Sequence, residues 1–538
     1  MPLPEGGAWP PLPYTRVADK LQSWSAWYSG DPDALALAYG AAVNQRDGSR
    51  YDQFNMLIDR PVQYRGGLVG RFARWFWGAP TPLGEKRHKL HVPIAGDIAA
   101  TSADLLFGQM PDISGLDIKT QALIDDLNDD GIHASLLEAA ELAAGLGGVY
   151  LKVCWDQEIS VHPWMDVAHA DAAIPEWQWN KLAAVTFWRV LEGPDSPGKS
   201  GTTVVRHLER HEAGVILHGL YEGTVDNLGH AVPLTEHPDT LALAGIVNDQ
   251  SAVPTGTTKL TASYVPNMRP NRLWRTDPAA TYLGRSDYSG VEPLMDALDE
   301  TWTSWMRDIR LGKARLIVPK TYLQNLGPGK GAMFDLEQEV FTGLDMLPQP
   351  GQAGDMITEN QFLIRVQEHA DTAAKITDQI IRDAGYSTQT FGELDVAGGR
   401  PTTATEVQAR ERKTMTTRGR KIGYWRAPLR DFYETLLQVD VQLNPGGVTP
   451  DRPIIEWPDA IEPDPQATAQ TVQMLHAAEA VSMETAVRLV HPDWDDTEVL
   501  QEVDKIKADQ PAMLDPMAFG HPPADPGAPD GPAGTVQQ

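Results

Sequence analysis

Cysteine is almost missing from this sequence, because its 538 residues include only Cys154. A single cysteine excludes a disulfide framework, and we interpret Cys154, within the apolar run VYLKVCWD, as a small buried hydrophobic residue. No run approaches the ~18 consecutive apolar residues of a membrane-spanning helix, so we expect no membrane association. The N-terminus, MPLPEGGAWPPLPYTR, lacks the charged and apolar regions of a secretory signal.

The sequence also lacks the motifs of several enzyme classes. GPGKG at 327–331 does not have the GxxxxGK[ST] spacing of a phosphate-binding loop, and no GxSxG nucleophile motif is present. His207 and His211 have a spacing that binds zinc on a helix. They fall at a predicted strand end and turn, so we expect no metal and no cofactor there.

Positive charge is scarce. Asp and Glu outnumber Lys and Arg by 73 to 45, which gives a formal net charge of −28. This is the wrong sign for a protein that grips nucleic acid, since Lys and Arg neutralise phosphates. Either the protein ignores nucleic acid, or it lets DNA pass without tight adhesion because an acidic body repels it.

The first half of the chain has mixed periodicity. Residues 1–90 are rich in Trp, Tyr and Pro, which is typical of segments that pack against a neighbour. Helices are expected at 91–108 and 119–144, the second with a break at Gly131. Strands are expected at 149–155, 184–191, 203–209 and 214–221, with an HEAG turn between the last two. This pattern predicts an α+β module with an antiparallel sheet.

Two long amphipathic helices follow, at 289–312 and 361–384. Ser289 and Glu292 have the spacing of a capping box before the first. In the second, apolar residues repeat at helical spacing from Val366 to Ala384. The helices flank a segment of short strands and turns at 313–360, so we expect them to lie side by side with that segment at one end.

A Gly-rich loop at 385–401 separates the second long helix from a basic helix. Within twelve residues the basic helix carries six cations and one acidic residue, Glu411. Two readings stay open: a solvated or salt-bridged face, or contact with a polyanion or another subunit. The cations are Arg410, Arg412, Lys413, Arg418, Arg420 and Lys421. Beyond Pro428, apolar residues at 429, 432, 433 and 436 return the helix to a core.

The C-terminal region begins with a predicted strand, PIIEW. Three helices are expected after it, at 466–480, 483–490 and 495–508. The final residues, 511–538, are mostly Pro, Ala, Gly and Asp, so we expect this tail to be disordered.

This order of parts resembles the portal protein of tailed bacteriophages, of the siphophage type. The likeness is carried by SDYSGVEPLMDALDETWTSWMRDI, RVQEHADTAAKITDQIIRDAGYS, GELDVAGGRPTTATEVQARERK and IIEWPDAIEPDPQATAQTVQMLHAAEAVSMETAV. It covers residues 280–510 in detail and rests on the order of modules before residue 280. No single part is a strict signature, so its specificity comes from the four parts together.

The resemblance implies an α+β, multi-module portal fold and a ring of twelve copies around a DNA channel. The implied parts are a wing (1–285), stem helix 1 (286–312), a β-rich clip (313–360), stem helix 2 (361–386), a tunnel loop (387–403), a basic helix returning to the wing (404–449), a helical crown (450–510) and a disordered tail (511–538).

The resemblance also implies which residues act. The tunnel loop would face the channel through Thr390, Phe391, Gly392, Glu393, Leu394, Asp395, Val396, Gly398, Gly399 and Arg400. The clip would dock partners through Lys320, Tyr322 and Lys330. The implied partners are double-stranded DNA without sequence readout, the terminase large subunit, major capsid and scaffold proteins, and head-completion adaptor or tail proteins. The implied location is the capsid portal vertex of a virion assembled in the host cytoplasm.

Two alternatives remain. One is another phage head or baseplate protein without a DNA channel. The other is an enzyme such as a metal-dependent nuclease or hydrolase. Its candidate carboxylates are Asp335 and Glu337, or Asp493, Asp495 and Asp496.

Overall fold

The computed structural model describes residues 2–35, 90–193, 202–311, 315–317, 324–325, 332–333, 358–360, 365–392, 404–446, 448–458, 465–478, 480–491, 494 and 496–509. The chain divides into two compact units. Unit 1 comprises Met1–Arg400 with Gln408–Ala460, and unit 2 comprises Pro401–Val407 with Ile461–Gln538. The finer division into wing, stem, clip, loop and crown stays a prediction.

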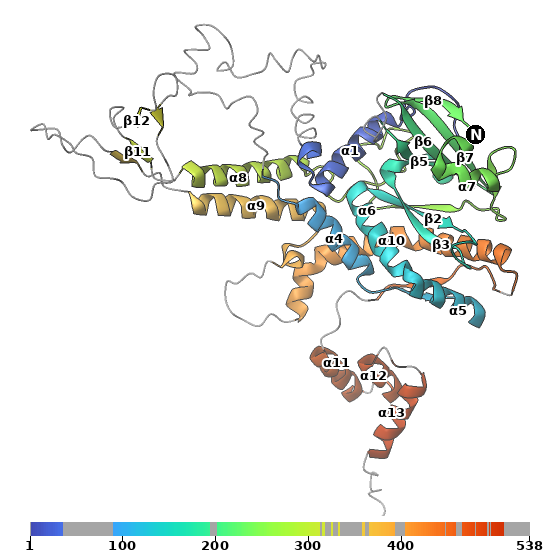
Figure 1. Ribbon diagram of the computed structural model, residues 1–538. Helices are drawn as coiled ribbons and strands as arrows, with labels where there is room; N and C mark the ends of the chain where they lie inside the picture. The colour runs from blue at the N-terminus through green and yellow to red at the C-terminus, as the bar shows by residue number, and fades with distance from the viewer. Residues whose placement is uncertain are drawn as a thin grey trace, which may run out of the picture. The chain divides into compact units, whose positions relative to one another are not determined.

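Helices form one layer of unit 1 (Figure 1). They are α1 (Thr15–Ser29), α4 (Ile94–Phe107), α5 (Ile118–Leu127), η3 (Asn128–Ile132) and α6 (His133–Leu146). The helices expected at 91–108 and 119–144 are confirmed. The expected break is confirmed too, because Gly131 has a φ of 103°, which glycine adopts at little cost. Asp117 caps α5 by accepting from the backbone N–H groups of Lys119 and Thr120.

Two antiparallel sheets lie beside these helices in unit 1. The smaller has the order β10-β2-β3, and the larger has the order β4-β5-β6-β7-β8 with β9 also paired to β7. The strands are β2 (Gly148–Cys154), β3 (Trp164–His169), β4 (Ala173–Gln178), β5 (Lys181–Glu192), β6 (Val204–Glu212), β7 (Val215–Thr224), β8 (Asn227–Val232), β9 (Ala252–Pro254) and β10 (Ala262–Pro266). The four expected strands and the hairpin between the last two are confirmed, with its turn at Ala213–Gly214 and not over the whole of 211–214, while β3, β4, β8, β9 and β10 were not predicted. A short helix, α7 (Pro238–Ile246), precedes β9.

One long helix, α10 (Ala404–Leu443), runs along the core of unit 1. Its second half buries Leu429, Phe432, Tyr433 and Leu436, as predicted. The Trp425 ring packs edge-on against Phe107 of α4, with ring centroids 4.8 Å apart. The helix continues through Pro428.

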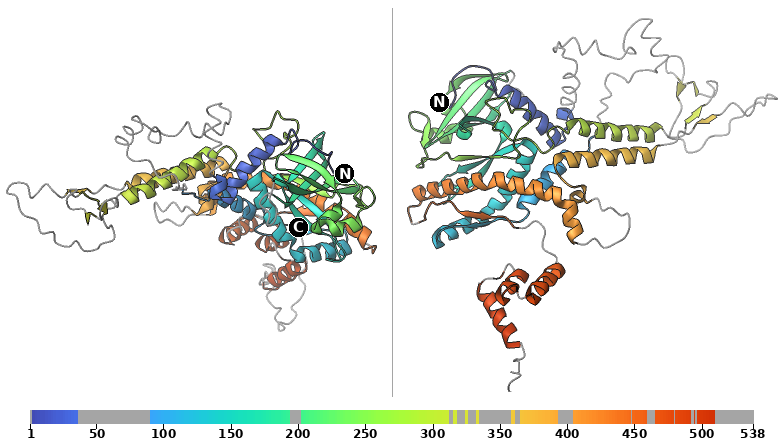
Figure 2. Two further views of the ribbon diagram at one scale, coloured as in Figure 1. Left: turned by 45° about the horizontal axis from the view of Figure 1, so that its top comes forward. Right: turned by 180° about the vertical axis from the view of Figure 1, so that it is seen from behind.

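The two long amphipathic helices are α8 (Glu292–Leu311) and α9 (Val366–Ala384). All views in Figures 1 and 2 show them side by side, as predicted. At the end of the helix pair that joins the main hydrophobic core, Met295 and Leu298 of α8 are buried, as are Ile380 and Ile381 of α9.

The other end of this helix pair is held by polar and aromatic contacts. Asp308 Oδ2 lies 3.0 Å from both Arg365 Nη2 and His369 Nε2, and Trp305 stacks on His369. The expected capping box is wrong in detail, because Glu292 accepts from the N–H of Gly290 and not of Ser289.

The described residues of the 313–360 segment are four short strands in two antiparallel pairs. β11 (Arg315–Ile317) pairs with β14 (Thr358–Asn360), and β12 (Gln324–Asn325) pairs with β13 (Ala332–Met333). Lys320, Tyr322 and Lys330 lie outside the described residues.

The predicted C-terminal elements are present. The predicted strand is β15 (Ile454–Glu456), which pairs with β1 (Asp112–Ser114) and belongs to unit 1. Unit 2 contains α11 (Pro465–Ala477), α12 (Met483–Val490) and α13 (Asp496–Asp509), with a small core of Val487, Val499 and Val503. In the part of the chain that the structure describes, no helix combines the length and apolar character needed to cross a membrane.

Candidate functional site

The described residues before segment 393–400 contact one side of α10. Lys413, Thr414, Thr417 and Lys421 recur on α10 at helical spacing, so they share one side of the helix. They contact the C-terminal end of α9 and the short turn η7 (Thr388–Phe391) that follows it. We call these four residues the polar clasp.

The polar clasp supplies partners for backbone groups that the end of α9 leaves unpaired. The Thr417 hydroxyl donates to the carbonyl of Gly385 at 2.7 Å, and Lys413 Nζ donates to the carbonyl of Arg382. The last carbonyls of a helix have no partner within it, so such bonds fix where α9 ends. Gly385 has a φ of 106°, and a Cβ there would lie 3.1 Å from the Thr417 hydroxyl oxygen.

Thr414 extends the polar clasp to the turn beyond α9. Its hydroxyl accepts from the N–H of Ser387 at 2.9 Å and lies 2.9 Å from the hydroxyl of Thr390. Thr414 is fully buried. These bonds hold η7 against α10.

A buried ion pair lies at the far end of the polar clasp. Lys421 Nζ lies 2.5 Å from Asp287 Oδ2, and each side chain is 1% exposed. Burial lowers the pKa of the Lys421 ammonium, and the negative charge of Asp287 opposes that shift.

Further hydrogen bonds complete the surroundings of this ion pair. Lys421 also donates to the Ser102 hydroxyl on α4, while Asp287 accepts from Tyr386 at 2.7 Å and from Asn267 at 2.7 Å. Burial raises the pKa of Tyr386 well above its ordinary value, which keeps the phenol a donor. The pair therefore connects α4, α10, the segment before α8 and the segment after α9.

The structure describes three of the predicted loop residues. Thr390 bonds to Thr414, and the Phe391 ring packs edge-on against Tyr386 with centroids 6.2 Å apart. Residues 388–391 form the turn η7, and the tunnel-loop assignment from residue 387 stays a prediction. Gly392 is exposed and has a φ of 83°. The others lie outside the described residues: Glu393, Leu394, Asp395, Val396, Gly398, Gly399 and Arg400.

The six predicted basic residues do not form one surface. Lys421 is buried, so the prediction that it contacts DNA or another subunit is wrong. Arg418 donates to the carbonyls of Leu105 and Pro458, each at 2.6 Å. Lys413, Arg412 and Arg420 have exposed side chains. Arg410 lies on α10, and its side chain is outside the described residues.

Several residues of this site were not predicted. They are Asp287, Tyr386, Ser387, Thr414 and Thr417. The sequence hinted at the threonines, since Thr414 and Thr417 lie at helical spacing from Lys421. It gave no hint of Asp287, because that residue lies 134 residues from Lys421 along the chain.

Replacing Thr414 with valine should loosen the turn after α9 while leaving the fold intact. The Ser387 N–H would lose its acceptor, and we expect its hydrogen exchange to quicken roughly tenfold, for about 1.4 kcal/mol. Exchange mass spectrometry over 385–392 measures this. Thr416→Val is the matched control, because that exposed hydroxyl donates only within α10. Equal exchange in the two variants would show that Thr414 does not hold the turn.

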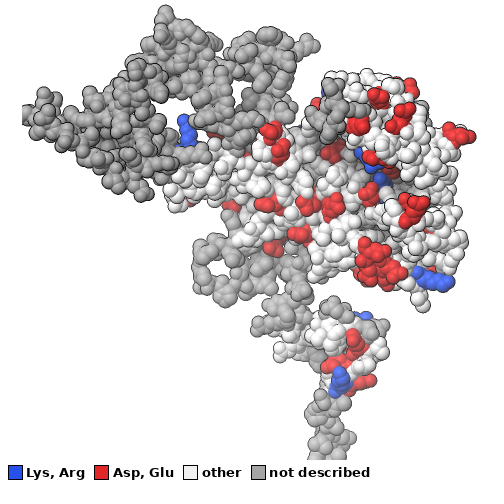
Figure 3. Space-filling view, viewed as in Figure 1, with Lys and Arg blue, Asp and Glu red and all other residues white. Residues whose placement is uncertain are grey.

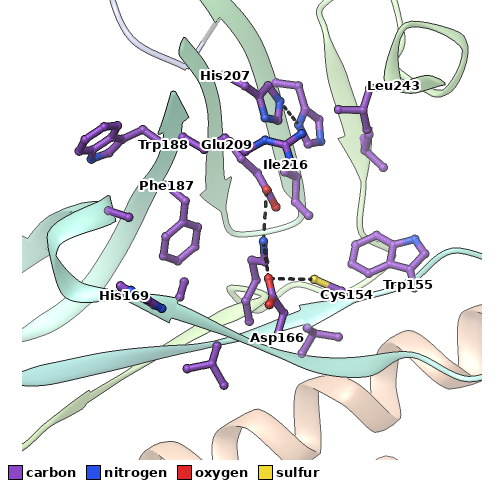
Figure 4. Close-up of a pocket in the computed structure, with 18 of the residues that line it drawn as sticks. Cys154, Trp155, Asp166, His169, Phe187, Trp188, His207, Glu209, Ile216 and Leu243 are labelled. Atoms are coloured by element: carbon purple, nitrogen blue, oxygen red, sulfur yellow. Dashed lines mark hydrogen bonds and ion pairs between the residues drawn. The ribbon is translucent and has the colours of Figure 1, made fainter. Parts of the chain in front are cut away.

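A cavity of about 590 Å³ between the two sheets is a second candidate site. Figure 4 shows Cys154 and Asp166 on one side of it, and His207 and Glu209 on the other. Lys152 connects the sides, with Nζ 2.9 Å from Asp166 and 3.3 Å from Glu209. The thiol of Cys154 is half-buried, not fully buried as predicted, and burial raises its pKa to about 12. It is therefore a poor nucleophile.

Two of the three histidines that line this cavity, His207 and His218, contact each other. His207 and His211 both lie within β6, which corrects their predicted position at a strand end and turn. The His207 ring stacks on His218, with Nε2 3.3 Å from Nδ1 of His218. His211 bonds to Thr261 at 2.7 Å and to Glu209 at 2.8 Å. Among the described residues, no group of three or more His, Cys, Asp or Glu side chains could hold a metal ion.

Acid should destabilise the fold through the His207–His218 pair. Burial, and then the neighbouring His218, lower the pKa of His207 from 6.5 to about 4, and burial also lowers the pKa of His218. Between pH 4 and pH 6.5, the folded and unfolded pKa values of His207, the unfolded chain binds more protons than the folded chain. Stability is therefore full above pH 6.5 and falls as pH drops towards 4, by roughly 3 kcal/mol for His207.

Urea denaturation between pH 4.5 and 7.5 measures this dependence. His207→Gln should flatten the curve in that window, while His230→Gln, at an exposed position, should leave it unchanged. A curve of unchanged slope in His207→Gln would refute the assignment.

The carboxylates considered for an enzyme do not form a described site. Asp335, Glu337, Asp493 and Asp495 lie outside the described residues, and Asp496 begins α13 with a side chain that is not described.

Comparison with solved structures finds similar chains in particles of a gene transfer agent (GTA). A chain from "Virion of native gene transfer agent (GTA) particle" is 13% identical, with a TM-score of 0.32, over 79% of this chain and 99% of that chain. A chain from "Neck of empty GTA particle computed with C6 symmetry" is 13% identical, with a TM-score of 0.35, over 80% and 95%. A chain from "Neck of native GTA particle computed with C12 symmetry" is 12% identical, with a TM-score of 0.33, over 81% and 99%. Scores this low support no argument about assembly.

Comparison with sequences gives a clearer result. No curated protein matches the chain. The family model described as "Phage portal protein, SPP1 Gp6-like" matches residues 222–512, which is more than half of the chain.

Proposed function

Because the chain belongs to the SPP1 Gp6-like family of phage portal proteins, we propose that it forms the ring at one capsid vertex through which DNA is packaged and ejected. Portal proteins are structural and not enzymatic. In this proposal twelve copies surround a channel, and the α8–α9 pair forms the stem of each copy.

The observation that carries this proposal is the polar clasp at the end of α9. It holds η7, which precedes segment 393–400, against α10. A loop held at its base while its Gly-rich part stays permissive can follow a moving duplex without a matching surface. This arrangement suits a loop that contacts DNA at the channel.

The charge of the chain supports a passage with low adhesion. The net charge is −28, and Asp and Glu dominate the charged residues on the face drawn in Figure 3. Such a surface repels the DNA backbone, and repeated copies around an axis would repeat that repulsion. Short-range contacts from a few cations would then hold DNA loosely, because salt screens them beyond a Debye length of about 8–10 Å. No base readout is needed for this task.

The proposed partners follow from the same assignment. The segment at 313–360 would dock the terminase large subunit during packaging and head-completion adaptor or tail proteins afterwards. Major capsid and scaffold proteins would surround the ring in the virion, after assembly in the host cytoplasm.

Negative-stain imaging of the purified full-length protein tests the proposal. We expect rings with a central opening and twelve-fold symmetry. Closed particles without an opening would instead support a head or baseplate protein that has no DNA channel. A protein that stays monomeric at high concentration would contradict the proposal.

A further inference from the structure

A group of arginines gathers beside α10 from distant parts of the sequence. Arg269 follows β10, and the residue before it, Met268, forms an antiparallel bridge with Arg285. Asparagine side chains fix this arrangement: Asn267 donates to the carbonyl of Arg285 at 3.0 Å, and Asn271 donates to that of Gly284 at 2.7 Å. The positions of these arginines are therefore set by the fold.

The helix α10 adds a further arginine to this group. Arg420 Nη2 lies 3.5 Å from the carbonyl oxygen of Arg269, and the Tyr424 hydroxyl donates to the same oxygen at 2.9 Å. The Arg269 guanidinium lies over the Tyr282 ring, 5.6 Å from its centroid. Arg272, three residues beyond Arg269, is exposed, as is Arg420. The positive charges of Arg272 and Arg420 act on Arg285, so these three guanidinium groups share one region, whereas that of Arg269 faces Tyr282.

The charge of this group is not neutralised within the described residues. No described carboxylate forms an ion pair with Arg269, Arg272, Arg285 or Arg420. The carboxylate that acts on Arg285 is Asp287, which is buried and paired with Lys421. Burial first, and then the positive charge of Arg272, lower the pKa of Arg285, and Arg420 adds to that effect. An unpaired cationic group in a chain of net charge −28 indicates an anionic ligand.

We propose that Arg272, Arg285 and Arg420 form a composite site for the phosphate backbone of double-stranded DNA. Guanidinium groups bind phosphate oxygens through planar, paired hydrogen bonds, and arginine stays charged when partly buried. The site binds phosphate without reading sequence, so it holds a duplex of any sequence.

The position of the site favours DNA over an acidic protein. Arg420 lies three residues beyond Thr417 of the polar clasp, a rise of about 4.5 Å along α10. DNA that passes close to the polar clasp would therefore come within reach of these arginines. This step rests on the proposed function as a DNA conduit.

The test is the salt dependence of DNA binding by the assembled protein. Fluorescence anisotropy of a short labelled duplex, titrated between 50 and 200 mM NaCl, gives the slope of log K against log salt. That slope is negative, and each lost phosphate contact makes it shallower by about 0.9. The double variant Arg272→Gln with Arg420→Gln should therefore make it shallower by about 1.8 for each chain that contacts the duplex. Two unrelated duplexes should show the same loss.

Two further double variants complete the test. Arg16→Gln with Lys119→Gln removes the same charge at exposed positions on α1 and α5, and it should keep the wild-type slope. Arg272→Lys with Arg420→Lys keeps the charge and should keep most of the slope.

Three results would overturn the inference. A glutamine variant that forms rings and keeps the wild-type slope overturns it while leaving the proposed function standing. A glutamine variant that no longer forms rings by light scattering shows instead that the arginines contact an acidic surface of a second copy. A wild-type protein that forms no ring overturns the proposed function, and the inference falls with it.

Discussion

Replacing Asp287 with alanine is expected to lower the free energy of unfolding by about 3–5 kcal/mol, because it leaves the buried ammonium of Lys421 without its counter-charge. Both side chains are 1% exposed, and the same carboxylate also accepts from Tyr386 and Asn267. Denaturation in guanidinium, followed by tryptophan fluorescence, measures the loss. Trp425 and Trp274 are buried in the same core and report on it.

Two variants make this test specific. Asp129→Ala, at an exposed acidic position, should change stability by no more than about 0.5 kcal/mol. The double variant Asp287→Asn with Lys421→Met removes both charges. Its loss of unfolding free energy should be smaller, by at least about 1 kcal/mol, than the summed losses of the single variants Asp287→Asn and Lys421→Met. Strictly additive effects would show that the two groups do not depend on each other.

Deleting Gly392–Gly399 is expected to leave ring assembly intact but to impair DNA packaging or retention. The polar clasp contacts residues up to Thr390, so the body keeps its bonds when the loop is removed. DNA would lose the contacts that this loop supplies in the proposed channel. Nuclease-protected DNA in assembled particles measures the effect, and imaging of the same particles confirms the rings.

Removal of residues 531–538 is the matched control for this deletion. It shortens the chain by the same number of residues and should leave packaging unchanged. Normal packaging by rings that lack 392–399 would remove the loop from the mechanism.

Much of the fold could be predicted because it rests on local patterns. Apolar residues at helical spacing located α8 and α9, and alternation with a turn located the β6–β7 hairpin. Gly131 was identified as a break because glycine alone adopts its positive φ at little cost. These signals lie within a few residues of each other, so no tertiary knowledge was needed.

The site could be predicted only in outline. The basic helix was found from composition, but composition does not say which cations are buried. Lys421 is a core residue because Asp287 and Tyr386, far away in sequence, converge on it. The arginine group beside α10 was missed for the same reason, since Arg285 and Arg420 are far apart in the sequence and act on each other only in the folded chain.

A reconstruction of the assembled protein with DNA in its channel tests the central claim most directly. The account predicts an open ring in which the polar clasp and segment 393–400 lie nearer the axis than α1, with DNA phosphates close to that segment. A ring in which segment 393–400 lies on the outer rim, away from DNA, would contradict it.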